Sequence, residues 1–156
     1  MNTLFYSMAG FALAASISPG PVNLLALSAG ATHGLRSSMR HVTGATFGFT
    51  ALLLAMGLGL QQLLQQWPAL THGVAWFGVA FLLYMAYGLA RSDGQLSGND
   101  AQQRPSLFKG ALMQWLNPKA WLASMAGMGA YAADGDLWRV GQFAALYFVI
   151  CYLSIS

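Results

Sequence analysis

Residues 16–23 read Ser-Ile-Ser-Pro-Gly-Pro-Val-Asn (SISPGPVN) and place two prolines and a glycine inside a long block, residues 1–35, that contains no Asp, Glu, Lys or Arg. Neither Pro19 nor Pro21 has an N–H, so the carbonyl four residues before each of them loses its helical hydrogen bond. In the hydrocarbon of a membrane, such carbonyls are tolerated only where protein or a watery cavity satisfies them. The sequence therefore predicts that the first helix breaks here and that the break faces inward.

A second interruption of the same kind lies in residues 114–119, Gln-Trp-Leu-Asn-Pro-Lys (QWLNPK). Asparagine is a strong N-cap and proline suits the first helical position, so Asn117 and Pro118 predict the start of a new half-helix. Lys119 then places a cation near membrane depth, and an intramembrane charge is costly enough to indicate a functional site by default. For either interruption alone, a kink without a ligand and a lysine that snorkels to the interface stay open as the alternative.

The composition identifies the chain as an integral membrane protein. Of its 156 residues, 56% are hydrophobic and 7% are charged, whereas about 25% are charged in ordinary soluble domains. The seven Lys and Arg do not cluster into a surface that tracks phosphates, so we expect no nucleic-acid partner. The single cysteine, Cys151, allows no disulfide within the chain. The sequence shows no metal-ligand or cofactor motif, so we expect neither a metal nor a cofactor.

We predict five membrane spans in a single transporter domain over residues 1–156, each close to the roughly 20 apolar residues that a span needs. The predicted spans are 3–32, 42–60, 69–90, 107–133 and 138–156, joined by connections at 33–40, 61–67, 91–106 and 134–137. Five Lys and Arg lie at the first and third connections and one lies at the fourth, so the positive-inside rule places the N-terminus outside. In the second span, Gly44 and Gly48 form a small-xxx-small pair that lets another helix come close.

The two interruptions lie three spans apart, an odd number, so their half-helices point in opposite directions across the bilayer, as in an inverted repeat. A shift of the sequence by 97 residues places Pro21 on Pro118 and Gly30 on Gly127. We therefore predict an all-α polytopic bundle built as a three-plus-three inverted repeat with broken helices 1 and 4. The first repeat covers about residues 1–90 and the second about 105–156, so we expect the sixth span to be missing from a truncated or abbreviated chain.

We expect the two breaks to meet near the middle of the bilayer and to bind a zwitterion. Half-helix N-termini favour an anion and unpaired carbonyls favour a cation, and an amino acid carries both charges. The carboxylate is expected at Lys119 and the amides of residues 20–23, and the ammonium at the carbonyls of Ile17 and Gln114. No Asp or Glu lies in a predicted span, so neutral or hydrophobic amino acids are expected rather than basic ones. The predicted substrate-binding residues are Ser18, Pro19, Gly20, Pro21, Asn23, Gln114, Asn117, Pro118 and Lys119.

Transport coupled to protons would need a titratable group, and the predicted spans contain no carboxylate to serve as one. The remaining candidates are Lys119 and the histidines at positions 33, 41 and 72. We favour His41, at the cytoplasmic mouth of the second predicted span, as the proton-coupling residue. An interfacial histidine without a role is the alternative.

These motifs resemble the LysE/RhtB family of bacterial amino-acid exporters over nearly the whole chain. The likeness is carried by residues 18–23 (SPGPVN), 33–36 (HGLR), 80–84 (AFLLY), 108–110 (FKG) and 116–120 (LNPKA). The resemblance implies an exporter of amino acids or related metabolites in the bacterial inner membrane, driven by the proton gradient and usually built from six hydrophobic segments. One departure is Val22, which stands before Asn23 where the common form of the motif has asparagine directly after the second proline.

Other classes of function fit the sequence less well. An enzyme is disfavoured because the sequence has no pair of membrane carboxylates, no HExxH motif and no Gly-x-Ser-x-Gly element. A non-transporting structural or assembly subunit, or an inactive truncated transporter, is the alternative to transport, because the chain is short. The expected partners are a small amino-acid substrate and membrane lipid, and further copies of the chain are a candidate partner in a homo-oligomer.

Overall fold

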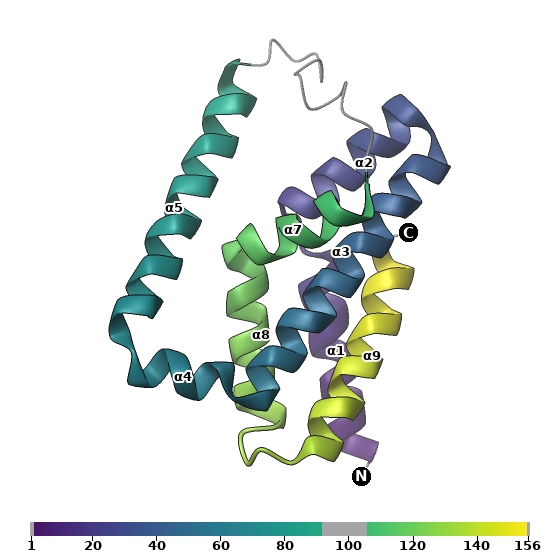
Figure 1. Ribbon diagram of the computed structural model, residues 1–156. Helices are drawn as coiled ribbons and strands as arrows, with labels where there is room; N and C mark the ends of the chain where they lie inside the picture. The colour runs from purple at the N-terminus through teal and green to yellow at the C-terminus, as the bar shows by residue number, and fades with distance from the viewer. Residues whose placement is uncertain (1, 92–105, 156) are drawn as a thin grey trace.

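The computed structural model describes residues 2–91 and 106–155, and all regular elements in these ranges are helices, as the sequence predicted (Figure 1). Their bounds are α1 Asn2–Ile17, α2 Pro21–His33, α3 Leu35–Ala55, the π-helical turn η1 Met56–Leu60, α4 Gln61–Gln66, α5 Pro68–Arg91, α7 Leu107–Leu116, α8 Pro118–Tyr131 and α9 Leu137–Ile155.

Two helical segments of the described chain are long and apolar enough to cross a membrane, namely Leu35–Leu60 and Leu137–Ile155. The bent pair Thr3–Ile17 and Pro21–His33 makes a third candidate if it is one span. These segments overlap the first, second and fifth spans predicted from the sequence. The third and fourth predicted spans coincide with α5 and with the pair α7 and α8, so the number of crossings stays a prediction.

The first predicted break is confirmed. Helix α1 ends at Ile17, α2 begins at Pro21, and the two are bent by 59° relative to each other. Gly20 precedes α2 in an extended conformation, and Pro21 takes the first helical position, where its missing N–H costs no helical hydrogen bond.

The second predicted break is also confirmed, together with its predicted cap. Helix α7 ends at Leu116 and α8 begins at Pro118, with Asn117 extended between them. The Oδ1 atom of Asn117 accepts a hydrogen bond of 3.1 Å from the backbone N–H of Lys119. This bond satisfies one of the donors that the start of a helix leaves open, so the half-helix α8 is specified locally by its own first residues.

The most extensive contacts in the described bundle are those of α7 with α3, of α1 with α9 and of α2 with α3. At the first contact, a Cβ atom on Gly48 would lie 2.6 Å from Ala111 Cα, so the two backbones touch. The indole N–H of Trp115 donates to the Gly48 carbonyl at 3.1 Å across the same contact. The predicted small-xxx-small pair therefore does admit a second helix. Figure 1 shows α1 and α9 side by side on the other flank of α3.

Two predicted connections are wrong. The segment 33–40 was expected to join the first two spans, but α3 already begins at Leu35, and the corner consists of Gly34, whose φ of 81° favours glycine. The early polar residues of α3 misled the prediction, because charged side chains are compatible with a helix that extends beyond the hydrocarbon. Similarly, most of the segment 61–67 is the short helix α4. The predicted connection 91–106 lies outside the described residues for positions 92–105.

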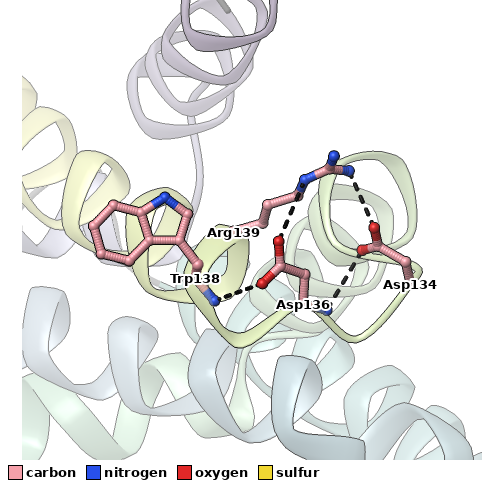
Figure 2. A network of polar contacts seen from close by, with 4 residues as sticks. All are labelled: Asp134, Asp136, Trp138 and Arg139. Atoms are coloured by element: carbon pink, nitrogen blue, oxygen red, sulfur yellow. Dashed lines mark hydrogen bonds and ion pairs between the residues drawn. The ribbon is translucent and has the colours of Figure 1, made fainter.

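The predicted connection 134–137 is a tight turn between α8 and α9, held by the network in Figure 2. Asp136 Oδ1 accepts from the backbone N–H of Trp138 at 3.0 Å, which caps the start of α9. Arg139 Nη1 lies 3.2 Å from Asp134 Oδ2, and its Nε lies 3.7 Å from Asp136 Oδ2. The one arginine at this end of the bundle is therefore paired with two carboxylates.

Candidate functional site

A small cavity lies where the two helix breaks meet. Its volume is about 30 Å³, which is room for about two water molecules. Of the nine residues predicted to bind substrate, the cavity wall contains Gly20 and Asn23 from the first break and Gln114, Asn117 and Lys119 from the second. Segments about one hundred residues apart in the sequence thus form one wall, as the interpretation of the two interruptions required.

Lys119 physically joins the two breaks. From the first turn of α8, its Nζ donates to the backbone carbonyl of Ser18, which follows the last turn of α1. Its side chain also lies against Gly20, where a Cβ atom would sit 3.2 Å from Lys119 Cδ and 3.3 Å from Nζ. Lys119 therefore does not snorkel to an interface. It uses a carbonyl that the broken helix leaves free.

The open end of α1 is closed by two polar side chains from its own neighbourhood. Asn23 Nδ2 donates to the carbonyls of Ser16 at 2.8 Å and Ser18 at 3.2 Å. The hydroxyl of Ser18 donates to the carbonyl of Ala15 at 2.9 Å, and this is one of the carbonyls that a proline deprives of its partner. The donors of Ser18 and Asn23, which we expected to be available to substrate, are therefore engaged with backbone.

The polar groups left open at the cavity are of two kinds. No side-chain hydrogen bond caps the start of α2, so the backbone amides after Pro21 are open donors at the positive end of the helix. Gln114 is buried and lines the cavity, and its side-chain amide makes no hydrogen bond with the described residues. Its carbonyl, predicted to accept from the substrate ammonium, instead accepts from the Asn117 N–H at 3.2 Å. These groups lie on the same wall as the Lys119 ammonium, so the wall offers hydrogen-bond donors for an anion. The Ser18 carbonyl beside them is an acceptor for a cation.

The prolines do not line the cavity. Pro21 and Pro118 each occupy the first position of a half-helix, and Pro19 lies in the segment between α1 and α2. Their contribution is to the backbone, because they end one helix and start the next. Among the nine predicted residues, direct contact with a ligand is thus supported geometrically for those on the wall and not for the prolines.

His41 lies apart from the cavity. It is 4% exposed within α3, and its Nε2 has no hydrogen-bond partner in the described part of the chain. The sequence placed it at the mouth of a span, but α3 begins six residues earlier, so His41 is buried at the contact between α3 and Gly110 of α7. It does not touch the cavity wall formed by the two breaks.

The sequence interpretation missed four residues of the cavity wall, one at the end of α1, one on α3 and two on α9. Ser16, Phe49, Tyr147 and Cys151 all line the cavity. Cys151 lies in an apolar run and was interpreted only as an unpaired thiol. The signal that could have found this wall is the spacing of Tyr147 and Cys151, because residues four apart lie on the same face of a helix.

Lys119 is the only charged residue on the cavity wall, and no acidic side chain is among the lining residues that the structure describes. Within the same described residues, no group of three or more His, Cys, Asp or Glu could hold a metal ion. The arrangement can bind a small molecule through one cation, several neutral donors and backbone carbonyls.

The model of the LysE type translocator family matches residues 13–156, almost the whole chain and both breaks. The chain belongs to the LysE type translocator family. It is thus a membrane protein of a translocator family, not a member of an enzyme family, in agreement with the resemblance noted from its motifs.

Curated relatives of this LysE-family chain share about 30% sequence identity with it. The cysteine/O-acetylserine efflux protein of Salmonella typhimurium is 31% identical over 123 residues, which are 78% of this chain and 62% of the relative. The protein of the same name from Escherichia coli K12 is 30% identical over 131 residues, which are 83% of this chain and 66% of the relative. The chain thus spans less than two thirds of the length of these relatives. No solved structure matches it significantly.

Proposed function

We propose that this LysE-family chain is a secondary transporter that exports small neutral amino acids, or related zwitterions, across the bacterial cytoplasmic membrane. The observation that carries the proposal is the contact of Lys119 with the Ser18 carbonyl across two broken helices, at a cavity lined by both breaks. The relatives are named cysteine/O-acetylserine efflux proteins, and this favours small polar members of the neutral class.

The wall offers complementary groups to both ends of a zwitterion. The carboxylate would pair with Lys119 and with the open amides at the start of α2, where the helix dipole favours an anion. The ammonium would be held by the Ser18 carbonyl, and Gln114 and Asn117 would supply further hydrogen bonds. Because the wall has no carboxylate, a second positive charge on the substrate would be unpaired, which disfavours basic amino acids.

Binding would require Lys119 to move. The cavity of about 30 Å³ is smaller than an amino acid, and the Lys119 ammonium occupies the carbonyl that the substrate ammonium would use. We infer an exchange, in which the substrate carboxylate draws the lysine off Ser18 and the substrate ammonium takes its place. The free site would then be closed by its own lysine until a zwitterion enters.

The packing supports the inverted repeat that we infer for the chain. The first half of broken helix 1, α1, packs on α9, and the first half of broken helix 4, α7, packs on α3. In a three-plus-three repeat, α3 is helix 2, α9 is helix 5, and these two helices are equivalent. The contact of α1 with α9 therefore corresponds to the contact of α7 with α3. Both second halves, α2 and α8, begin at the prolines that the 97-residue shift superimposes, and the chain runs along them in opposite directions (Figure 1).

We place the end where α3 and α7 begin on the cytoplasmic side. Arg36, Arg40 and Lys109 lie in the first turns of these helices, and the opposite end carries Arg139, which is paired with Asp134 and Asp136. Positive charge therefore collects at one end, as the positive-inside rule requires of the cytoplasmic side. Large apolar side chains that remain exposed, such as those of Phe47, Leu122 and Leu153, would face lipid.

The proposal is tested by exchange in proteoliposomes. Vesicles that contain the purified chain are loaded with unlabelled L-serine or L-alanine, and the entry of trace labelled amino acid is followed. We expect accumulation of label for small neutral amino acids, none for labelled L-lysine, and none in vesicles without protein. Intact, inserted protein that exchanges no neutral amino acid would overturn the proposal and favour a structural subunit.

A further inference from the structure

The end of α1, at the first break, contains a buried hydroxyl without a hydrogen-bond partner among the described residues. Ser16 is 4% exposed, lines the cavity, and its Oγ makes no hydrogen bond with any described residue. It lies next to the Tyr147 hydroxyl and the Cys151 thiol, close enough to interact with both, but it forms no well-aligned hydrogen bond with either. Buried polar groups are normally paired, so an open hydroxyl at a cavity indicates a place for a ligand atom or a water.

The groups around Ser16 are held rigidly by α9. Tyr147 and Cys151 are one helical turn apart, so both face α1. The Tyr147 ring stacks on Phe49 at a centroid distance of 4.4 Å and meets Phe143 edge-on at 5.8 Å. The hydroxyl of Thr46 donates to the Cys151 sulfur at 4.0 Å, so the thiol proton is not needed for that contact. The Tyr147 ring is therefore fixed by its aromatic neighbours, and the Cys151 thiol proton stays available to Ser16 or to a ligand.

This second polar region belongs to the same cavity as Lys119 and Gln114. The groups around Lys119 supply partners for the ammonium and carboxylate that all amino acids share. The wall at Ser16 supplies partners for a different group of the substrate. In an α-amino acid bound by its ammonium and carboxylate, the remaining group is the side chain. A wall of small residues, including Ala120 and Ala123, completes the cavity.

We propose that Ser16, with Cys151 beside it, forms the subsite for the substrate side chain and selects short side chains that end in a hydroxyl, a thiol or an ester carbonyl. This inference rests on the proposed function, because it assumes that the zwitterion lies at Lys119. A hydrogen-bonding side chain would satisfy Ser16, whereas a methyl group would leave it unpaired, so serine is preferred over alanine by at least about tenfold.

The test compares L-serine with L-alanine in wild type and Ser16→Ala. Initial rates of exchange in proteoliposomes give kcat/KM for each substrate. We expect Ser16→Ala to reduce the preference for serine over alanine, the ratio of the two kcat/KM values, to less than about threefold. Ser124→Ala is the matched control, because Ser124 is buried, lies off the cavity wall and donates only to the Ala120 carbonyl of its own helix. It should keep the wild-type preference.

An unchanged preference in active Ser16→Ala protein would overturn the subsite and leave the proposed function intact. This result is also expected if Ser16 only holds a resident water. Wild-type protein that exchanges no amino acid would instead overturn the proposed function, and the next measurement decides about the subsite in that case.

Cys151 reports on the subsite without transport. It is the only cysteine in the sequence and lines the cavity, so a small methanethiosulfonate reagent on purified wild-type protein labels this one thiol when the cavity opens. We expect L-serine to slow the labelling at about tenfold lower concentration than L-alanine, and Ser16→Ala to remove the difference. Equal protection by both amino acids, or protection by neither, would contradict the subsite.

Discussion

Substitution of Gly48 by alanine tests whether the backbone contact between α3 and α7 sets the geometry of the second break. The added Cβ would lie 2.6 Å from Ala111 Cα, whereas ordinary contact begins at 3.4 Å. The helices would have to separate by the difference, about 0.8 Å, and forced packing of this kind costs about 1–3 kcal/mol. The separation would also strain the hydrogen bond from Trp115 to the Gly48 carbonyl, worth about 1 kcal/mol. The better helix propensity of alanine recovers about 1 kcal/mol.

We therefore expect Gly48→Ala to lower the free energy of unfolding by about 1–3 kcal/mol, or Tm by about 3–9 °C for a chain of this size. Thermal unfolding in detergent is followed with a maleimide dye that fluoresces on reaction with Cys151, which is 3% exposed and the only thiol of the sequence. The matched control is Gly141→Ala in α9, where a Cβ would meet nothing within 4 Å. The control should melt at or slightly above the wild-type temperature.

A Gly48→Ala protein that melts with wild type would refute the reasoning, because the helices would then tolerate a methyl group between their backbones. Equal destabilisation by both substitutions would refute it too, since the cost would come from glycine replacement in general. Exchange should fall in Gly48→Ala, because α7 carries Gln114 to the cavity wall.

Three further predictions concern the proposed function. Lys119→Met should reduce exchange at least about 100-fold, because it removes the charge-assisted contact to a carboxylate. It should change the free energy of unfolding by less than about 1 kcal/mol, because Asn23 still donates to the Ser18 carbonyl. Lys109→Met is the matched control, and exchange by Lys119→Met within threefold of this control would assign Lys119 to structure. Pro118→Ala should allow α7 and α8 to join and reduce exchange at least about tenfold, whereas Pro68→Ala at the start of α5 should not; equal exchange in both would make the proline incidental. His41→Gln should retain exchange but lose the accumulation of substrate that a pH gradient drives. If the variant accumulates as much substrate under a pH gradient as wild type, His41 is not on the proton path.

The breaks could be predicted from the sequence because their causes are local. Proline lacks an N–H and asparagine caps the next helix within two residues, so positions 19–21 and 117–118 specify the interruptions whatever surrounds them. The meeting of the two breaks was predicted from the odd number of intervening spans, which gives the opposed half-helices of an inverted repeat. These arguments use only covalent structure and the low polarity of the membrane.

The second wall of the cavity could not be predicted in the same way. Tyr147 and Cys151 read as ordinary residues of an apolar helix, and only the packing of α9 on α1 brings them to Ser16. The predicted contacts of Ser18 and Asn23 with substrate stay predictions, and their present partners could not be foreseen for a related reason. Both types of side chain bind either a ligand or a nearby carbonyl, and the structure shows the backbone of the broken helix as their partner.

The helix breaks also explain how a lysine can be kept in this place. An ammonium in a membrane protein needs acceptors, and among the described residues no carboxylate lines the cavity. The Ser18 carbonyl, in the segment between α1 and α2, supplies the acceptor, so the same interruption that forms the site also stabilises its only charge. On the proposed exchange, a zwitterion adds no net charge, because its ammonium replaces the lysine on the carbonyl and its carboxylate pairs with the displaced lysine. A basic amino acid would leave an additional unpaired cation at a site of low polarity. Selection against basic amino acids then follows from charge balance alone, and selection among the neutral ones is left to the wall at Ser16.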